Sequence, residues 1–135
     1  SPAAKGMALC MQAALDDAGL AACDVDYING HATGTDVGDI AEAQATHQVF
    51  GDQVPLVSTK GYIGHTLGAC GAIESIFLLE MMRHGIMIPC KNLDTIGDCS
   101  GPWILNEQRE APIKVAMNNN FAFGGINTSL IYGAF

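Results

Sequence analysis

The sequence has little charge, and positive charge is the scarcer kind. Six Lys and Arg residues stand against 14 Asp and Glu, the formal net charge is -8 at pH 7, and charged residues make up 15% of the 135 residues. Such an acidic chain repels phosphate, which argues against nucleic acid or an anionic membrane as partner. Hydrophobic residues make up 49%, and a lone soluble domain usually carries more charge than this chain does. We therefore expect another domain or subunit to cover part of this chain.

Long apolar runs and metal-binding cysteine pairs are missing as well. No apolar run approaches the roughly 18 residues that a membrane-spanning helix needs, and no secretory leader pattern opens the sequence. The cysteines are odd in number and irregularly spaced, and none forms a CxxC or CxxH pair, so we expect no zinc site. They are Cys10, Cys23, Cys70, Cys90 and Cys99. The cysteine spacing predicts reduced thiols in a cytoplasmic protein with no bound metal. The lack of a long apolar run predicts no membrane partner.

Helical and strand patterns follow one another along the chain. Apolar residues at helical spacing predict helices over residues 3–20, 36–50 and 66–84, with Gly19 ending the first and Asp36 or Asp39 capping the second. Strand-like runs cover residues 25–29, 54–58, 86–89, 103–106, 114–117 and 129–132. The length suits one domain, residues 1–135, around a single core. Because the first helix begins with no linker ahead of it, we expect the chain to be the second part of something longer.

A glycine-rich loop around a histidine follows the first predicted strand. Residues 29–39 read NGHATGTDVGD, and the histidine is His31. Glycines let the backbone turn and approach a ligand closely, and open α/β sheets bind ligands beyond the carboxyl ends of their strands. A histidine in such a loop is also compatible with a purely structural role. The loop on its own leaves both interpretations open.

The second predicted strand leads into a similar arrangement. Residues 59–65 read TKGYIGH, so that Lys60 and His65 lie in the loop that precedes the third helix. Glu74 is the only charged residue in the first half of that helix. A carboxylate in apolar company needs a cation, and Lys60 is the nearest candidate. The alternative, that both side chains reach solvent separately, stays open.

Asparagine and phenylalanine mark a third segment, between the last two predicted strands. Residues 118–127 read NNNFAFGGIN, and we interpret them as a loop. Asn tolerates left-handed backbone, and the Gly-Gly pair gives access to positive φ. The segment is either a wide hairpin turn or a loop whose backbone amides face a ligand and whose Phe side chains gate a pocket.

The three segments GHATGTDVGD, STKGYIGHTLGACGAIES and NNNFAFGGINTSLIY together resemble, in order and spacing, the C-terminal half of the β-ketoacyl synthases. These are the condensing enzymes of fatty-acid and polyketide synthesis, and the resemblance covers nearly the whole chain. It implies a thiolase-like α/β fold, with a five-stranded mixed sheet layered with helices as the C-terminal half of an αβαβα architecture. The implied partners are an acyl-carrier protein, the N-terminal half of the synthase and a second copy in a homodimer. The resemblance implies no cofactor, since the substrates are carried on the phosphopantetheine of the carrier protein.

The resemblance also assigns roles to individual residues. His31 and His65 fall on the family's two histidine positions, where two N–H groups would stabilise the enolate formed when malonyl-carrier protein is decarboxylated. The Phe123 amide matches a second oxyanion hole, and the Thr hydroxyls match those that bond the pantetheine arm. The implied residues are His31, His65, Lys60, Glu74 and Phe123 for catalysis, Thr33 and Thr35 for the pantetheine arm, and Phe121 and Phe123 for the substrate gate.

The family's nucleophilic cysteine belongs to its N-terminal half, and no cysteine of this chain matches it. Cys70 lies where the family has a small helix residue, and we interpret it as packing. We therefore expect the 135 residues alone to be inactive. A non-catalytic subunit of the same fold, similar to a chain-length factor or a scaffold, remains the alternative, although the retained histidines, Lys60 and threonines speak against it. A degradative thiolase is disfavoured because the sequence lacks the CxGGG context of the second thiolase cysteine.

Overall fold

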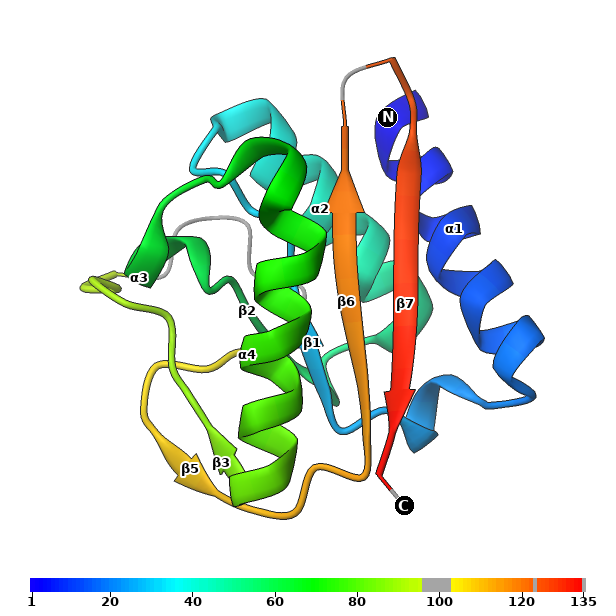
Figure 1. Ribbon diagram of the computed structural model, residues 1–135. Coiled ribbons are helices and arrows are strands. Elements are labelled where there is room, and N and C mark those ends of the chain that lie inside the picture. The colour runs from blue at the N-terminus through cyan, green and yellow to red at the C-terminus, as the bar shows by residue number, and fades with distance from the viewer. Residues whose placement is uncertain (96–102, 123, 135) are drawn as a thin grey trace.

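A layered α/β structure is formed by residues 1–95, 103–122 and 124–134, which the computed structural model describes (Figure 1). The helices are α1 (Pro2–Ala18), α2 (Asp36–Phe50), α3 (Lys60–Ile63) and α4 (Cys70–His84), with 3-10 turns η1 (Ala22–Asp24) and η2 (Leu67–Ala69). The strands are β1 (Tyr27–Asn29), β2 (Pro55–Val57), β3 (Ile86–Met87), β4 (Trp103–Ile104), β5 (Arg109–Glu110), β6 (Val115–Phe121) and β7 (Asn127–Gly133).

Five strands form one mixed sheet in the order β4-β2-β1-β6-β7. Strands β4, β2, β1 and β6 run parallel to one another, and β7 runs antiparallel to β6 at the edge of the sheet. This confirms the five-stranded mixed sheet expected from the sequence. In register, Ile28 of β1 lies opposite Leu56 of β2 and Met117 of β6. The parallel strands therefore all present their carboxyl ends at one edge, and the loops that follow β1 and β2 meet there.

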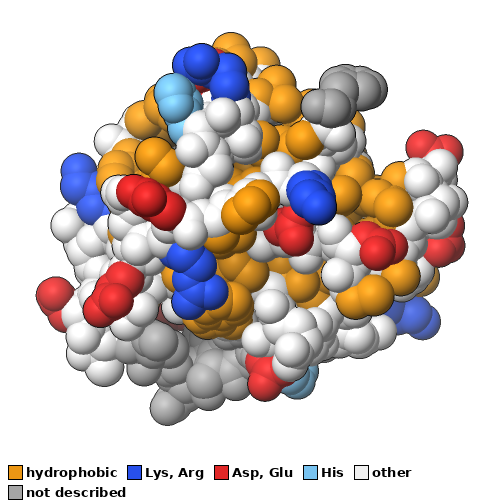
Figure 2. All heavy atoms as spheres, turned by 90° about the horizontal axis from the view of Figure 1, so that it is seen from below, with side chains coloured by type: hydrophobic (Ala, Val, Ile, Leu, Met, Phe, Trp, Pro, Cys, Tyr) orange, Lys and Arg blue, Asp and Glu red, His pale blue; other side chains and the backbone are white. Residues whose placement is uncertain are grey.

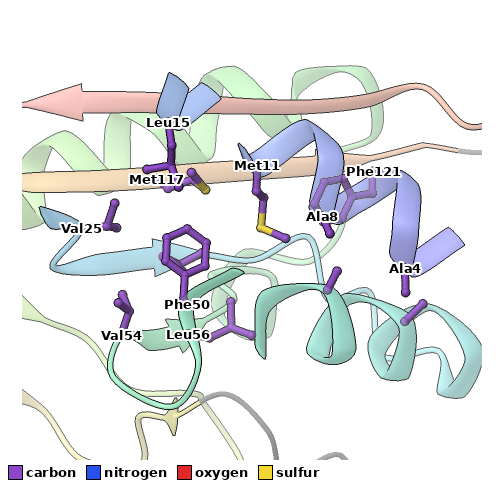
Figure 3. Close-up of a cluster of buried hydrophobic side chains, with 13 residues drawn as sticks. Ala4, Ala8, Met11, Leu15, Val25, Phe50, Val54, Leu56, Met117 and Phe121 are labelled. Atoms are coloured by element: carbon purple, nitrogen blue, oxygen red, sulfur yellow. The ribbon is translucent and has the colours of Figure 1, made fainter. Parts of the chain in front are cut away.

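Alternation along the strands builds a separate core on each face of the sheet. In Figure 1, α4 lies in front of the sheet, and α1 and α2 lie behind it. Ile28 and Met117 belong to the core behind the sheet, together with Met11 and Leu15 of α1. Figure 3 shows Met117 beside these two helix residues. Tyr27 and Ala116, which come just before Ile28 and Met117, point to the other face. They form the front core with Leu78 and Met81 of α4. Because successive strand residues point to opposite faces, Asn29 and Asn118, next along each strand, face α4.

The asparagine segment is where the sequence interpretation was wrong. Residues 118–121 were assigned to a loop, but they continue β6 and pair with β7, Asn118 opposite Leu130 and Phe121 opposite Asn127. Asparagine is depleted in strands, and here tertiary contacts override that preference. Asn118 donates to the Ser75 hydroxyl and the Gly71 carbonyl of α4, and Asn119 donates to Met11 Sδ of α1. The turn itself is restricted to the residues after Phe121.

Four smaller differences concern short elements and the ends of long ones. Residues 60–63 form the short helix α3 where a loop was expected, and the third long helix begins at Cys70 rather than at residue 66, after the turn η2. The predicted helix end at Gly19 is confirmed by its left-handed φ of 66°. Thr35, and neither Asp36 nor Asp39, occupies the N-cap of α2. Strand β5 was not predicted, because it consists of two exposed charged residues.

Figure 2 shows the end of the molecule at which the parallel strands of Figure 1 begin, and apolar and charged side chains are interspersed on this face. A hollow of about 360 Å³ lies at this end, and Val54, Trp103 and Arg109 are among its lining residues. The Arg109 guanidinium lies 4.5 Å from the centroid of the Trp103 ring, a cation–π contact. Within the described residues, no helix is both long and apolar enough to cross a membrane.

Candidate active site

The two histidines singled out in the sequence meet at the carboxyl edge of the sheet. His31 follows β1 by two residues, and His65 follows α3 by two. Their ring centroids are 5.5 Å apart with an interplanar angle of 89°, an edge-to-face arrangement. The Phe121 ring, at the end of β6, lies 6.4 Å from that of His31. The pairing of β1 with β6 thus joins segments that are 89 residues apart in sequence.

The proton of His65 is placed by a backbone contact. The Leu67 amide donates to His65 Nδ1 at 3.0 Å, so that this nitrogen acts as an acceptor. A neutral imidazole has one donor and one acceptor nitrogen, and its proton is therefore on Nε2. Leu67 reaches this position with φ of 53°, in the left-handed region that a residue with a branched side chain rarely adopts. The site thus tolerates backbone strain where it fixes the tautomer of a histidine.

His31 is held neutral by its surroundings. Burial lowers its pKa to about 4, and the positive charge of Lys60 adds to this shift. The ring is therefore uncharged at pH 7 and offers one N–H donor. Within the described part of the chain, its buried Nδ1 has no hydrogen-bond partner. Each ring can therefore present one N–H donor, His31 as a neutral imidazole and His65 through Nε2.

The buried ion pair expected between Lys60 and Glu74 is present. Lys60 Nζ lies 2.6 Å from Glu74 Oε1, and the residues are 8% and 0% exposed. The alternative, in which the two side chains reach solvent separately, is excluded. Asn29 Nδ2 lies 3.4 Å from the other Glu74 oxygen and donates to it. The short helix α3 places Lys60 beside the first half of α4, in which Glu74 is the only charged residue.

A network of side-chain amides and hydroxyls lies beneath this ion pair, and sequence reasoning missed it. Asn29 Nδ2 donates to Asn118 Oδ1 at 2.8 Å, and Asn29 Oδ1 accepts from the Thr59 amide at 3.2 Å. Asn118 Nδ2 and the Tyr132 hydroxyl both donate to Ser75 Oγ, at 3.0 and 2.8 Å. A buried network with its polar groups paired is rigid. It fixes the ends of β1 and β6 to α4.

Glu42 of α2 is a second residue that sequence reasoning missed. Its two carboxylate oxygens accept from the backbone amides of His31 and Ala32, each at 2.7 Å. The residue is 3% exposed, and burial raises its pKa to about 7 against the opposing effect of these two N–H groups. A Cβ atom on Gly30 would lie 2.9 Å from Glu42 Oε1, so glycine is needed there. An acid between the apolar residues of a helix was the signal that could have revealed it, as it did for Glu74.

We expect Glu42→Gln to change how stability depends on pH. Because the pKa of Glu42 is raised, the folded state keeps a proton between pH 4.5 and about 7 that the unfolded state releases. The contribution of Glu42 to the free energy of unfolding therefore falls by about 3 kcal/mol as pH rises through this window. Glutamine does not titrate, so Glu42→Gln should gain stability relative to the native protein between pH 5 and pH 8 in denaturant titrations.

The lowered pKa of His31 has the opposite effect, because its contribution to stability is lost as pH falls from 6.5 to about 4. Both the native protein and Glu42→Gln retain His31, so this effect is common to the two. The difference between variant and native protein isolates Glu42. Glu80→Gln, which removes an exposed carboxylate, serves as the matched control. Parallel curves of unfolding free energy against pH for the native protein and Glu42→Gln would contradict the prediction.

The threonines of the first loop lie at the surface beside a cavity. Thr33 Oγ1 and Thr35 Oγ1 are 3.3 Å apart. Thr33, Lys60 and His65 are among the residues that line a cavity of about 410 Å³. Phe123, expected to contribute an amide and a gating ring, lies outside the described residues. The described ranges contain no group of three or more His, Cys, Asp or Glu residues that could hold a metal ion.

Comparison with known proteins places this geometry in context. Residues 1–94 match the family model described as β-ketoacyl synthase, C-terminal domain. The 3-oxoacyl-(acyl-carrier-protein) synthase 1 of Escherichia coli K12 is 37% identical over 97% of this chain and 32% of its own length. The synthase 2 of Rhizobium meliloti is 42% identical over 94% of this chain and 31% of its own length. The chain thus spans about a third of the length of the curated relatives it matches.

Solved structures give the same result. A crystal structure of a β-ketoacyl synthase from Burkholderia phymatum STM815 superposes with a TM-score of 0.93 at 48% identity, over 98% of this chain and 33% of the other. The structure described as the ishigamide ketosynthase/chain length factor superposes with a TM-score of 0.90 at 33% identity, over 98% of this chain and 33% of the other. The similarity therefore extends over both the parallel strands and the β6–β7 hairpin.

Proposed function

The chain belongs to the β-ketoacyl synthase family, and we propose that residues 1–135 form the C-terminal domain of a 3-oxoacyl-(acyl-carrier-protein) synthase. The expected thiolase-like fold is confirmed by the superposition on a β-ketoacyl synthase. The proposed enzyme is an acyltransferase that condenses an acyl thioester with malonyl-carrier protein in fatty-acid or polyketide synthesis. Because the chain spans about a third of its curated relatives, we assign the nucleophilic cysteine to an N-terminal half of the same synthase.

The observation that carries this proposal is the pair of histidines 5.5 Å apart. In the proposed reaction the bond between the malonyl carboxylate and Cα breaks, CO₂ leaves, and the electron pair moves onto the thioester oxygen as an enolate. Two N–H donors aimed at that oxygen stabilise the charge as it develops. His65 Nε2 carries one such proton, and the neutral His31 ring supplies the other. The enolate carbon then attacks the acyl thioester carbonyl, and the cysteine sulfur leaves as thiolate.

Lys60 and Glu74 support the histidine pair in this proposal. The Lys60 charge helps to keep the pKa of His31 low, and Glu74 compensates that charge where water cannot reach it. Thr33 and Thr35 would donate to the amide-rich pantetheine arm, and the cavity that Thr33 lines supports this assignment. Phe121 and Phe123 would gate the acyl pocket. The Phe121 ring edge beside His31 supports the first of these two roles.

We propose that the N-terminal half covers the exposed apolar residues near the site. Leu67 of η2 and Ile76, Phe77 and Leu79 of α4 are exposed in this chain. Apolar side chains clustered on one helix mark a surface that another domain covers. We further propose a cytoplasmic homodimer that takes its substrates from an acyl-carrier protein. In support, a relative of 33% identity and TM-score 0.89 is described as a ketosynthase in complex with a type II PKS acyl-carrier protein.

A comparison of the isolated chain with the complete synthase tests the proposal. We expect the complete synthase to release CO₂ from malonyl-carrier protein and to condense the resulting enolate with an acyl thioester, and iodoacetamide should stop the condensation by alkylating the nucleophilic cysteine. The isolated 135 residues should do neither. Condensation by the isolated chain would contradict the division of the site. A complete synthase with no activity would favour the alternative, a non-catalytic subunit similar to a chain-length factor.

A further inference from the structure

The thiol of Cys70 contacts the histidine nitrogen that the Leu67 amide also reaches. Cys70 Sγ lies 3.2 Å from His65 Nδ1, well within hydrogen-bond distance for sulfur. Cys70 is the first residue of α4 and is 3% exposed, whereas His65 is exposed. The sequence interpretation of Cys70 as a packing residue does not account for this polar contact. Ordinary packing requires no sulfur at the acceptor atom of an imidazole.

The direction of this hydrogen bond follows from its neighbours. His65 Nδ1 accepts from the Leu67 amide at 3.0 Å, so it presents a lone pair and no proton. The Thr66 hydroxyl donates to Cys70 Sγ at 3.5 Å, which occupies the sulfur as an acceptor. The S–H of Cys70 is then left to donate, and Nδ1 lies within its reach. A chain of donors therefore runs from Thr66 through Cys70 to His65.

We propose that Cys70 is a positioning residue for the decarboxylation step, acting through His65. With the Leu67 amide it forms a clamp on Nδ1, in which the two donors share the single lone pair of that nitrogen. The clamp holds the ring orientation and keeps its proton on Nε2, the side that faces the enolate oxygen. A proton on Nδ1 would point at the Leu67 N–H and the Cys70 S–H, and both hydrogen bonds to Nδ1 would be lost. This inference rests on the proposed function, because positioning has meaning only if His65 Nε2 serves as a donor to substrate.

The test uses the complete synthase carrying ¹⁵N-labelled histidine, with the variants Cys70→Ala and Cys70→Ser. Losing a donor on an imine-type nitrogen moves its ¹⁵N resonance downfield, so Cys70→Ala should shift His65 Nδ1 downfield. Its kcat for malonyl decarboxylation should fall roughly 3–10-fold, the loss of about one hydrogen bond, with KM unchanged. Cys70→Ser retains a donor and should restore much of both readouts. Cys10→Ala, which removes a thiol from α1, is the matched control and should change neither.

An unchanged His65 Nδ1 resonance in Cys70→Ala would overturn the inference. Equal losses of kcat in the alanine and serine variants, with no difference between their spectra, would show that Cys70 only fills space and would overturn it as well. A synthase that is inactive with its native sequence would instead overturn the proposed function. The two failures are distinguishable, because the His65 spectrum is recorded without turnover.

Discussion

Replacing His65 with alanine in the complete synthase is expected to lower malonyl decarboxylation roughly 10²–10³-fold, the usual cost of removing one oxyanion-hole donor. The Leu67 amide fixes the His65 proton on Nε2, and alanine removes that donor. Acylation of the nucleophilic cysteine does not form the malonyl enolate, so it should survive better. The two steps are measured separately, as CO₂ released from malonyl-carrier protein and as acyl-enzyme formed from an acyl thioester. His31→Ala should give the same pattern.

His84→Ala is the matched control, since His84 is an exposed histidine at the far end of α4, beside Glu80. It should leave both steps unchanged. If His65→Ala or His31→Ala slowed acylation and decarboxylation equally, the assignment of the histidines as donors to the enolate would be wrong. A general loss of this kind would indicate instead that the histidines hold the site together.

Lys60→Met is expected to destabilise the fold by about 3–5 kcal/mol, because it leaves the Glu74 carboxylate buried without its counter-ion. The 2.6 Å pair is almost completely excluded from water, so solvent cannot replace the lost ammonium group. The same substitution should raise the pKa of His31 toward its ordinary value, since the Lys60 charge is one of the causes that lower it. Denaturant unfolding and an NMR titration of His31 measure the two effects.

Two further variants separate charge burial from loss of packing. Lys60→Met combined with Glu74→Gln removes both charges and should recover a large part of the lost stability. Arg83→Met breaks the exposed pair of Arg83 with Glu80 and should have little measurable effect, because water solvates both groups. If Lys60→Met unfolded no more readily than Arg83→Met, the buried pair would not be the stabilising contact that its geometry indicates.

Local patterns in the sequence predicted the long helices and the five strands of the mixed sheet, and they made Lys60 the candidate partner of Glu74. Helical periodicity depends on near neighbours, and glycine at position 19 ends α1 because its left-handed backbone suits glycine. The ion pair could be inferred because a lone carboxylate in an apolar helix needs a cation. The order of three glycine-rich segments then indicated the family, which the comparisons show.

The polar groups around the histidines could not be inferred in the same way. Asn118 looks like a loop residue in sequence, and only the pairing of β6 between β1 and β7 places its amide against Ser75. The apolar helix residues around Glu42 indicate burial, but only the packing of α2 against the end of β1 places its carboxylate beneath His31. Burial by residues distant in sequence, and not local preference, decided both positions.

By itself the sequence determined the long helices, the existence of the five sheet strands, the family and the identity of the two histidines, because these depend on local spacing and on motifs read in order. The tertiary structure decided which neighbours control each histidine. Glu42 holds the backbone of His31, whereas Leu67 and Cys70 reach Nδ1 of His65. A hydrogen bond depends on distances of a few tenths of an ångström. Such distances are set only when α2, α4 and the sheet pack together.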